Sequence, residues 1–435
     1  MNKEKRSRFL KADVGKKMLA IFVLLSMVIP VVPGLAIGVQ KGDQAASIQK
    51  NDSSLASTLV TDKEPENNIP VIENMLSGNT IYVPNDYPTI QAAIDAASSG
   101  DTIFVFSGIY YEHLTINKQV ILTGEDRNTT IIDGNGSGDV VIVNVDYVQI
   151  HGFTIQRSGD GVGSRYYYSG IRLRSNNNII SGNIPTNNRG SGIRLEGSSS
   201  SIITDNTITD NRAGGIVLDN TCSFNTFTHN TITNNQADGI SLGENVYYTN
   251  NCFSNTITGN TITNYRGYGI GLQHSSFNTI TDNTIISNLG IFGICLQTDT
   301  HSNIIYHNTI INPNPVCDEG SNNTWYIATR CEGNYWSNYQ GVDINQDGIG
   351  DMAYWINGPT NNYDSYPLMH PFKLGDMNLD GQVTFADIDP WVMALSNPVA
   401  YQAQYHIRAT LHGDINQDAR ITFADIDPFV ALLGS

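Results

Sequence analysis

Two stretches near the C-terminus, "DMNLDGQVTFAD" and "DINQDARITFAD", carry oxygen-bearing side chains at the same spacing. In each stretch Asp or Asn stands at positions 1, 3 and 5, a backbone carbonyl is available at position 7, Thr stands at position 9 and Asp at position 12. This spacing points oxygen ligands into one loop, which is the coordination that Ca²⁺ takes in proteins. The predicted ligands are Asp376, Asn378, Asp380, Gln382, Thr384 and Asp387 in the first loop, and Asp414, Asn416, Asp418, Arg420, Thr422 and Asp425 in the second.

A shorter stretch of the same kind, "DINQDGIGD", comes earlier in the chain. Its oxygen side chains surround a glycine, so it is a third candidate calcium loop, and a metal-free Asx turn is the alternative. The bend residue of the two complete loops differs, Gly381 in the first and Ala419 in the second. A left-handed alanine costs roughly 1 to 2 kcal/mol, so we expect the second loop to bind calcium more weakly. The ligands of the third candidate are Asp343, Asn345, Asp347 and Asp351.

Charged residues in the phrases "GIRLRS" and "GIRLEG" form a second candidate site. If the Ile and Leu of each phrase are buried in a strand, the residues between them point outward and Arg172 lies over Arg194. Two stacked arginines suit a bound carboxylate, and nearby tyrosines suit stacking on sugar rings. An ordinary ion-pair ladder, with Arg174 over Glu196, is the alternative. The predicted substrate-binding residues are Arg172, Arg174, Arg194, Tyr166, Tyr167 and Tyr168, and the carboxylate pair to test first for catalysis is Glu196 and Asp219.

The elements that would position these residues repeat from about residue 80 to residue 312. Successive copies are 22 to 25 residues apart, with one step of 30. Alternating apolar residues in so short a repeat predict strands that become buried only when they stack as coils of a parallel β-helix. A leucine-rich horseshoe is disfavoured because Thr, Ile and Asn replace its leucines. The repeated anchors are Ile171, Ile193, Ile216, Ile240, Ile270 and Ile294, and Asn183, Asn206, Asn230, Asn260, Asn283 and Asn308.

The predicted coils assign two roles to asparagine and one to cysteine. Asparagine tolerates a left-handed backbone at the turns, and stacked asparagines can satisfy one another's amides. Two cysteines stand three residues before equivalent asparagines, so they should stack one coil apart, and two more flank a short loop. Cys295 is left as a buried or free thiol, and metal binding is disfavoured because no Cys-x-x-Cys spacing occurs. The predicted disulfides join Cys222 to Cys252 and Cys317 to Cys331.

The start of the repeat reads "TIYVPNDYPTIQAAIDAASSGDTIFV", which predicts a strand and then a short helix over 89–97 that covers the first coil. This opening, the Asn-rich coils and the closing "GNYWSNYQGVDINQDGIGDMAYW" resemble the NosD-type right-handed β-helix family over residues 79–372. The resemblance implies an exported β-helix that faces polysaccharide, without fixing a reaction. A copper site would need clustered His, Met or Cys, but His229 and His307 lie three coils apart, about 14 Å. We therefore expect no copper site.

The two complete calcium loops each lead into an apolar helix, "IDPWVMAL" and "IDPFVALL". This duplicated arrangement is similar to a type I dockerin, the module that plugs exported proteins into cohesin receptors. An EF-hand pair is the rival interpretation, disfavoured because Asp replaces the bidentate Glu and the entering helix is missing. The resemblance implies that Ca²⁺ supplies much of the folding free energy of this module. It places cohesin recognition at Phe385, Ala386, Phe423 and Ala424.

The N-terminus carries seven basic residues before an apolar run from about 18 to 39. Two prolines break the run, so we expect a cleaved signal peptide over 1–36, and a retained anchor is the alternative. A polar linker over 37–78, a mainly β domain over 79–372 and a small α-helical dockerin-like domain over 373–435 complete the predicted organisation.

The formal net charge of −17 makes nucleic acid an unlikely partner. The expected partners are polysaccharide and a cohesin-like protein, with membrane contact only if the N-terminal segment is retained. Three functions fit this sequence. The first is a polysaccharide-binding β-helix docked through calcium at the cell surface, the second a polysaccharide lyase or glycoside hydrolase in such an assembly, and the third a structural surface-layer protein.

Overall fold

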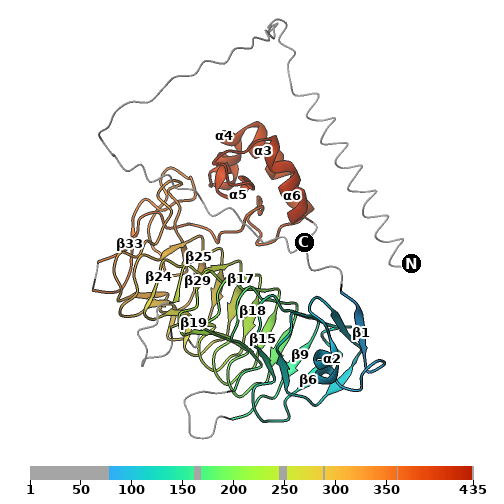
Figure 1. The fold of residues 1–435 in the computed structure, drawn as a ribbon. Coiled ribbons are helices and arrows are strands. Elements are labelled where there is room, and N and C mark those ends of the chain that lie inside the picture. The colour runs from blue at the N-terminus through green and yellow to red at the C-terminus, as the bar shows by residue number, and fades with distance from the viewer. Residues whose placement is uncertain (1–77, 161–167, 244–251, 288–289, 360, 434–435) are drawn as a thin grey trace, which may run out of the picture. The chain divides into compact units, whose positions relative to one another are not determined.

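The computed structural model describes residues 78–160, 168–243, 252–287, 290–359 and 361–433. Most of this chain forms a parallel β-helix of the right-handed type, in which short strands stack coil upon coil (Figure 1). A full coil contributes one strand to each of three parallel sheets, which we name sheets A, B and C. The fold predicted from the repeat is therefore confirmed.

The strands are short and follow one another in the order A, B, C along each coil. Sheet A contains β1 (Thr80–Val83), β2 (Thr102–Val105), β5 (Ile121–Gly124), β8 (Gln149–His151), β11 (Ile179–Ser181), β14 (Ile202–Thr204), β17 (Thr226–Thr228), β21 (Thr256–Thr258), β25 (Thr279–Thr281) and β28 (Ile304–Tyr306). Sheet B contains β3 (Gly108–Tyr110), β6 (Thr130–Asp133), β9 (Thr154–Gln156), β12 (Ile184–Thr186), β15 (Thr207–Thr209), β18 (Thr231–Thr233), β22 (Thr261–Thr263), β26 (Thr284–Ile286), β29 (Thr309–Ile311) and β31 (Tyr335–Trp336). Sheet C contains β4 (Leu114–Ile116), β7 (Val141–Val143), β10 (Ile171–Leu173), β13 (Ile193–Glu196), β16 (Ile216–Asp219), β19 (Ile240–Leu242), β23 (Tyr268–Leu272), β27 (Phe292–Leu296) and β30 (Val316–Asp318). Two small sheets pair β20 (Cys252–Phe253) with β24 (Ser275–Ser276), and β32 (Tyr354–Trp355) with β33 (Tyr363–Asp364).

Apolar side chains stack in columns inside the coils. Ile171 pairs with Ile193, Ile193 pairs with Ile216, and all three are fully buried. Because successive residues of a strand point to opposite faces, the neighbours of each column point outward. One coil could not bury such a column alone, so the hydrophobic stabilisation comes from stacking.

Ladders of asparagine side chains join consecutive coils at their corners. Asn206 Oδ1 accepts hydrogen bonds from the backbone N–H of Asn183 (2.9 Å) and from its side-chain Nδ2 (3.2 Å). Asn206 Nδ2 in turn donates to the carbonyl of Ile180 at 2.8 Å. Buried polar groups at each corner are thereby satisfied, as a buried backbone requires. The same ladder continues through Asn230, Asn260, Asn283, Asn308 and Asn334, and a second one through Asn225, Asn255, Asn278, Asn303 and Asn323.

The left-handed residue of each corner is the one before the ladder asparagine, not the asparagine itself. Along the first ladder these preceding residues have φ between 54° and 64°. Other asparagines, among them Asn177, Asn187 and Asn234, do occupy left-handed turn positions. The two predicted roles of asparagine are therefore filled by different residues, and the ladder asparagines serve by hydrogen bonding. The left-handed residues before the ladder asparagines are Gly182, Asp205, His229, Gly259, Asp282 and His307.

A short helix covers the first coil. Helix α2 (Ile90–Ala96) begins at the N-cap Thr89 and packs beside β1 (Figure 1). Its residues Ile90, Ala93 and Ile94 are buried. The carboxylate of Glu112 accepts the first two backbone N–H groups of the helix, each at 2.9 Å. The capping helix predicted over 89–97 is confirmed.

Two buried aspartates terminate the ladders at the other end of the β-helix. Asp364 Oδ2 accepts the backbone N–H of Asn334 (2.7 Å) and the indole N–H of Trp336 (2.9 Å). Asp318 receives the last amide of the second ladder and the indole N–H of Trp325, at 3.0 and 2.9 Å. A carboxylate suits this position because it only accepts hydrogen bonds, and the last coil presents only donors. Burial raises the pKa of Asp364 to about 6, although these donors oppose the shift.

Beyond the β-helix the chain forms two related helical halves. Each half begins with a one-turn 3-10 helix and a reciprocal Thr–Asp capping box. The equivalent residues Trp391 and Phe429 stack on each other, with ring centroids 5.3 Å apart and planes 13° from parallel. Ile349 and Leu368 belong to the same hydrophobic core. The elements are the 3-10 helices η2 (Phe385–Asp387) and η3 (Phe423–Asp425), and the helices α3 (Ile388–Ser396), α4 (Pro398–Tyr405), α5 (Ala409–Gly413) and α6 (Ile426–Leu432).

The cysteine pairing differs from the prediction. Cys317 on β30 is bonded to Cys295 on the adjacent strand β27, with 4.7 Å between their Cα atoms. The predicted bond from Cys317 to Cys331 is therefore wrong, because equivalent positions of neighbouring coils are closer in space than the two ends of a loop. Cys222 and Cys252 do lie on adjacent coils, since the residues that follow them pair, but both are free buried thiols.

The asparagine ladder generates the first testable prediction. Replacing Asn230 with Ala removes hydrogen bonds to buried groups of the coils on both sides, so we expect a loss of roughly 3 kcal/mol or more in the free energy of unfolding. Urea unfolding followed by circular dichroism measures this loss. The matched control is Asn144→Ala on an exposed asparagine, which should cost less than about 0.5 kcal/mol. Equal effects of the two substitutions would contradict the ladder's role.

The raised pKa of Asp364 predicts how stability depends on pH. The folded protein keeps this proton up to about pH 6, whereas the unfolded chain releases it near 3.8. The folded state therefore gains stability at low pH, and this gain, roughly 3 kcal/mol, is lost as the pH rises from about 4 to 6. The difference in unfolding free energy between wild type and Asp364→Asn should change across this window.

Candidate functional site

The outer face of sheet C carries the charged residues that the sequence singled out. Arg172 on β10 pairs with Arg194 on β13, and Glu196 pairs with Asp219 on β16. The predicted stacking of the two arginines is therefore confirmed. The strands pair in parallel without an offset, so equivalent outward side chains of successive coils lie in one row along the β-helix.

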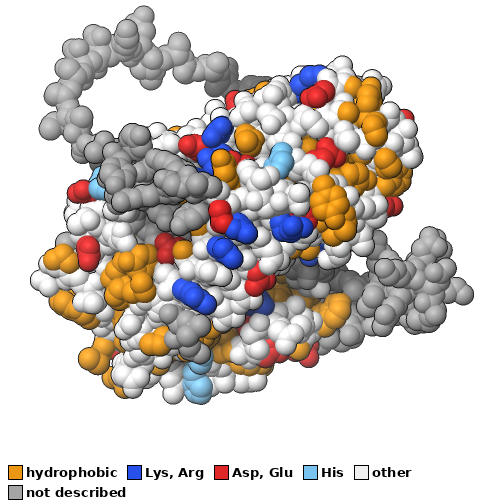
Figure 2. Space-filling model, turned by 90° about the horizontal axis from the view of Figure 1, so that it is seen from below, with side chains coloured by type: hydrophobic (Ala, Val, Ile, Leu, Met, Phe, Trp, Pro, Cys, Tyr) orange, Lys and Arg blue, Asp and Glu red, His pale blue; other side chains and the backbone are white. Residues whose placement is uncertain are grey.

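Each of the three arginines in this group is paired with a carboxylate. The pairs are Arg172 with Asp139 (3.0 Å) and with Glu196 (3.4 Å), Arg174 with Glu196 (3.0 Å), and Arg194 with Asp219. Three positive and three negative groups balance, so this geometry matches the ion-pair ladder. Basic and acidic side chains are also interspersed on the face drawn in Figure 2, instead of gathering by sign. A bound carboxylate would have to compete with the protein's own.

The two carboxylates considered for catalysis have pKa values shifted in opposite directions. Burial raises the pKa of Asp219, and the charge of Arg194 only partly opposes it. Burial also acts on Glu196, but the hydrogen bond from Arg174 and the surrounding arginine charges outweigh it and lower that pKa. Such a pair can in principle act as acid and base. The Asp219 side chain, however, is only 2% exposed, against 26% for Glu196.

Of the three tyrosines predicted to bind substrate, the structure describes only one. Tyr168 is 39% exposed just before β10, while Tyr166 and Tyr167 lie outside the described residues. The sequence analysis missed Asp139, which also accepts the backbone N–H of Ser169 at 2.6 Å. The sequence did contain a signal for Asp139: it stands two residues before Val141, which occupies the position of the anchor isoleucine in the preceding coil.

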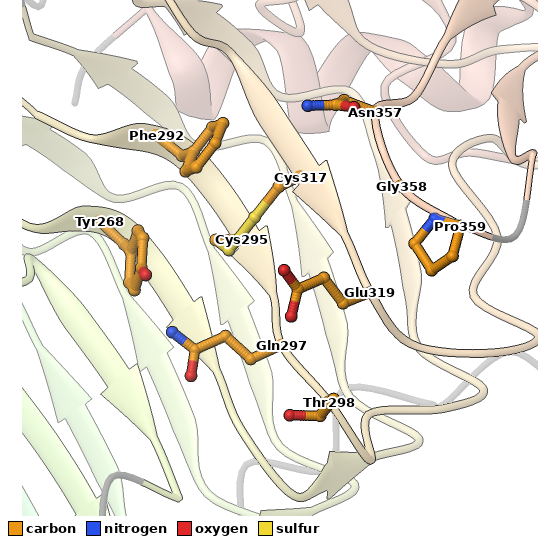
Figure 3. Close-up of a pocket in the computed structure, with 10 residues that line it drawn as sticks. All are labelled: Tyr268, Phe292, Cys295, Gln297, Thr298, Cys317, Glu319, Asn357, Gly358 and Pro359. Atoms are coloured by element: carbon orange, nitrogen blue, oxygen red, sulfur yellow. A yellow bond between two sulfur atoms is a disulfide. The ribbon is translucent and has the colours of Figure 1, made fainter.

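The last coils of sheet C border a cavity of about 260 Å³ (Figure 3). Tyr268 and Phe292 lie on one side with Gln297 beside Tyr268, the Cys295–Cys317 disulfide lies in the middle, and Glu319 and Asn357 lie on the other side. The sequence analysis also missed this cavity. Its signal was an aromatic residue two positions before the anchor isoleucine in two consecutive copies.

The three candidate calcium loops share one pattern of hydrogen bonds. The first aspartate of each loop accepts the backbone N–H groups of the fourth and fifth residues after it, at 2.7 to 3.2 Å. The asparagine two positions on accepts the same fourth N–H in each loop. The bend residues are Gly348, Gly381 and Ala419, with φ of 86°, 84° and 70°. The left-handed alanine expected in the last loop is therefore confirmed.

The aspartates at both ends of the two complete loops are almost fully buried. Asp376 and Asp414 are 3% and 2% exposed, and Asp387 and Asp425 are fully buried. Burial raises the pKa of Asp376 and of Asp414, which shows that their environment disfavours negative charge. Over the described ranges, no three His, Cys, Asp or Glu side chains come together in a group that could hold a metal ion.

These features define a class of protein, a parallel β-helix with a polar outer face and a small helical module. Residues 94–341, more than half of the chain, match the family described as periplasmic copper-binding protein (NosD), and the chain belongs to that family. A probable ABC transporter binding protein NosD from Stutzerimonas stutzeri is 32% identical over 100 residues. That match covers 23% of this chain and 22% of the relative, so the chain matches about a fifth of that protein's length.

Solved structures with a similar fold have low sequence identity to this chain. A complex of XylC with xylose has 12% identity and a TM-score of 0.45, covering 55% of this chain and 65% of that one. Pectate lyase Pel9A has 14% identity and a TM-score of 0.42, covering 58% and 88%. Within the described ranges, no helix combines the length and the apolar character needed to cross a bilayer.

The copper named in the family description does not fit the histidines of this chain. His229 and His307 occupy equivalent corners three coils apart, as predicted, with Gly259 and Asp282 between them. His307 is buried, and its Nε2 lies 2.7 Å from a carboxylate oxygen of Glu332. Neither histidine belongs to a group of three or more His, Cys, Asp or Glu side chains that could hold a metal ion among the described residues, so we assign no copper chemistry to these two.

Proposed function

We propose that this protein is an exported β-helix that binds polysaccharide along the outer face of sheet C. The observation that carries the proposal is the placement of exposed aromatic and charged side chains on early coils and of a cavity on late coils of the same sheet. Tyr168 and Arg174 flank β10 and are substantially exposed, and Glu196 lies beside Arg174. The stacked strands of sheet C form one continuous face along which an extended polymer could lie.

Binding is favoured over catalysis by the burial of one carboxylate. A polysaccharide lyase or glycoside hydrolase acting through Glu196 and Asp219 is the second candidate, supported by the opposite shifts of their pKa values. A general acid must reach the scissile bond, and Asp219 is shielded from solvent and held by Arg194. An assay for reducing ends or unsaturated products on uronic-acid polymers separates the two functions.

We further propose that the C-terminal helical halves form a calcium-loaded, dockerin-like module. The loops share one pattern of hydrogen bonds, and their oxygen side chains stand at the sequence positions that a calcium loop uses. The buried aspartates that end each loop form no ion pair with Lys or Arg in the described residues, so a bound cation would compensate their charge. The calcium ligands would be those named from the sequence, and the loop at Asp343 would be a third site of the same design.

A cohesin-like partner is the proposed ligand of this module. Phe385 and Phe423 are 42% and 60% exposed, and the alanine after each is also exposed. The equivalent residues Trp391 and Phe429 stack on each other, as they would if a twofold axis related the two halves, and the halves would then present equivalent surfaces. Such a module could engage its partner in either of two orientations.

Polysaccharide binding predicts an effect of Arg174. On a glycan array of neutral and uronic-acid oligosaccharides, the full chain should retain at least one class, and Arg174→Ala should weaken that binding roughly ten-fold by loss of one charged hydrogen bond. The matched control is Arg212→Ala, at another exposed arginine, which should bind as wild type does. Absence of binding to every glycan would favour the structural surface-layer alternative.

The calcium module predicts a difference between its two loops. Replacing Ala419 with Gly relieves a left-handed alanine, so the second loop should bind calcium roughly five-fold more tightly, about 1 kcal/mol. Calorimetric titration measures this change. Asp376→Ala should lose more total affinity than Asp414→Ala, and the reverse order would count against the assignment.

Chelation supplies the control for the whole module. Excess chelator should remove the circular dichroism signal of the C-terminal helices while the β-helix stays folded, and it should abolish capture by immobilised type I cohesin. Intact helices without calcium, or capture that ignores the chelator, would show that the loops are ordinary Asx turns.

A further inference from the structure

The cavity at the end of sheet C is bordered by three polar side chains that are open to solvent: Glu319 and Asn357 are exposed, and Gln297 is half-buried. In the described part of the chain, the side chains of Gln297, Glu319 and Asn357 form no hydrogen bond or ion pair with any other residue, although all three border the cavity. The ladder amides, by contrast, are bonded at both ends. Three polar side chains that converge on a cavity without internal partners are available to a ligand.

The cavity also has an apolar, aromatic part. The rings of Tyr268 and Phe292 lie on consecutive coils with centroids 6.3 Å apart and planes 28° from parallel. The Cys295–Cys317 disulfide adds a further apolar surface in the middle of the cavity (Figure 3). A ligand that fits must therefore have one apolar side and one side rich in hydrogen-bonding groups. A pyranose ring has this character, with C–H groups on one face and hydroxyl groups around its edge.

The negative charge of the cavity favours neutral sugars over anionic ones. Glu319 is the one charged residue of its lining, and the described lining holds no Lys or Arg. An anionic sugar would meet this carboxylate in a chain of formal charge −17, whereas neutral hydroxyl groups can donate to it. The amides of Gln297 and Asn357 can both donate to and accept from hydroxyl groups.

We propose that this cavity is a binding subsite for one neutral sugar unit of a polysaccharide. The inference rests on the proposed function, since it names the sugar class that the outer face of sheet C would hold. The coil that carries the cavity is four coils from the one that carries Arg194, about 19 Å along the axis. One extended oligosaccharide could therefore reach both places.

The test uses the full chain and isothermal titration calorimetry with defined oligosaccharides. The neutral probes are xylo-, cello- and manno-oligosaccharides, and the acidic probe is oligogalacturonate. At least one neutral probe should bind, and Phe292→Ala and Gln297→Ala should each weaken it at least ten-fold. Glu319→Gln should keep neutral binding within about three-fold while improving the acidic probe. The matched control is Phe224→Ala, at a phenylalanine exposed elsewhere, which should bind as wild type does.

The outcomes separate this inference from the proposed function. Neutral binding that survives Phe292→Ala and Gln297→Ala overturns the subsite but leaves polysaccharide binding in place. Binding of oligogalacturonate alone likewise overturns the neutral subsite. Binding of none of the probes overturns the neutral subsite, and the glycan array then decides separately whether the protein binds polysaccharide. Unchanged thermal unfolding of the variants, measured in parallel, assigns any loss of binding to the cavity and not to misfolding.

Discussion

Inward asparagines at the corners hold consecutive coils in register, and the outer sites of the protein require that register. A chain that turns sharply three times per coil buries backbone N–H and C=O groups that no strand can pair. Asn206, for example, accepts from the coil before it and donates to that coil's carbonyl, while its own N–H is accepted by Asn230. Each coil is therefore held in register with its neighbours. This register places Arg172 over Arg194 and Tyr268 beside Phe292 on the outside.

A ladder of this kind must end, and its end creates the cavity. The carboxylate of Asp318 accepts the last amide of one ladder and also the side-chain Nδ2 of Asn362, at 2.8 Å. Its backbone N–H donates to the carbonyl of Asn357 at 2.8 Å. The segment that follows the coils is thereby held against the last strand of sheet C. Asn357 consequently faces Phe292 across the cavity, so an element that terminates the fold also forms a wall of the proposed subsite.

The sequence predicted the coils, their register and the capping helix because all three depend on local periodicity. The Cys295–Cys317 disulfide also follows this periodicity, but the prediction joined Cys317 to Cys331 across a short loop instead. The 22-residue separation of Cys295 and Cys317 equals one coil, so the period itself identified the pair. The ion-pair partner of Arg172 could not be found among its neighbours in the same repeat, because Asp139 belongs to the preceding coil. The cavity could not be predicted from the repeat, because Asn357 lies in the segment after the coils, which has no repeat.

The helical tail is governed by a different constraint, the burial of like charges in a small module. Backbone N–H groups stabilise the carboxylates of Asp376 and Asp414 but carry only partial charge, and burial still raises both pKa values. A divalent cation would remove this cost in both halves. The halves are nevertheless unequal, since Gly381 adopts its left-handed bend freely and Ala419 does not. Two surfaces that are equivalent in sequence would then differ in the calcium concentration at which each becomes ordered, which would bias the orientation in which a partner binds.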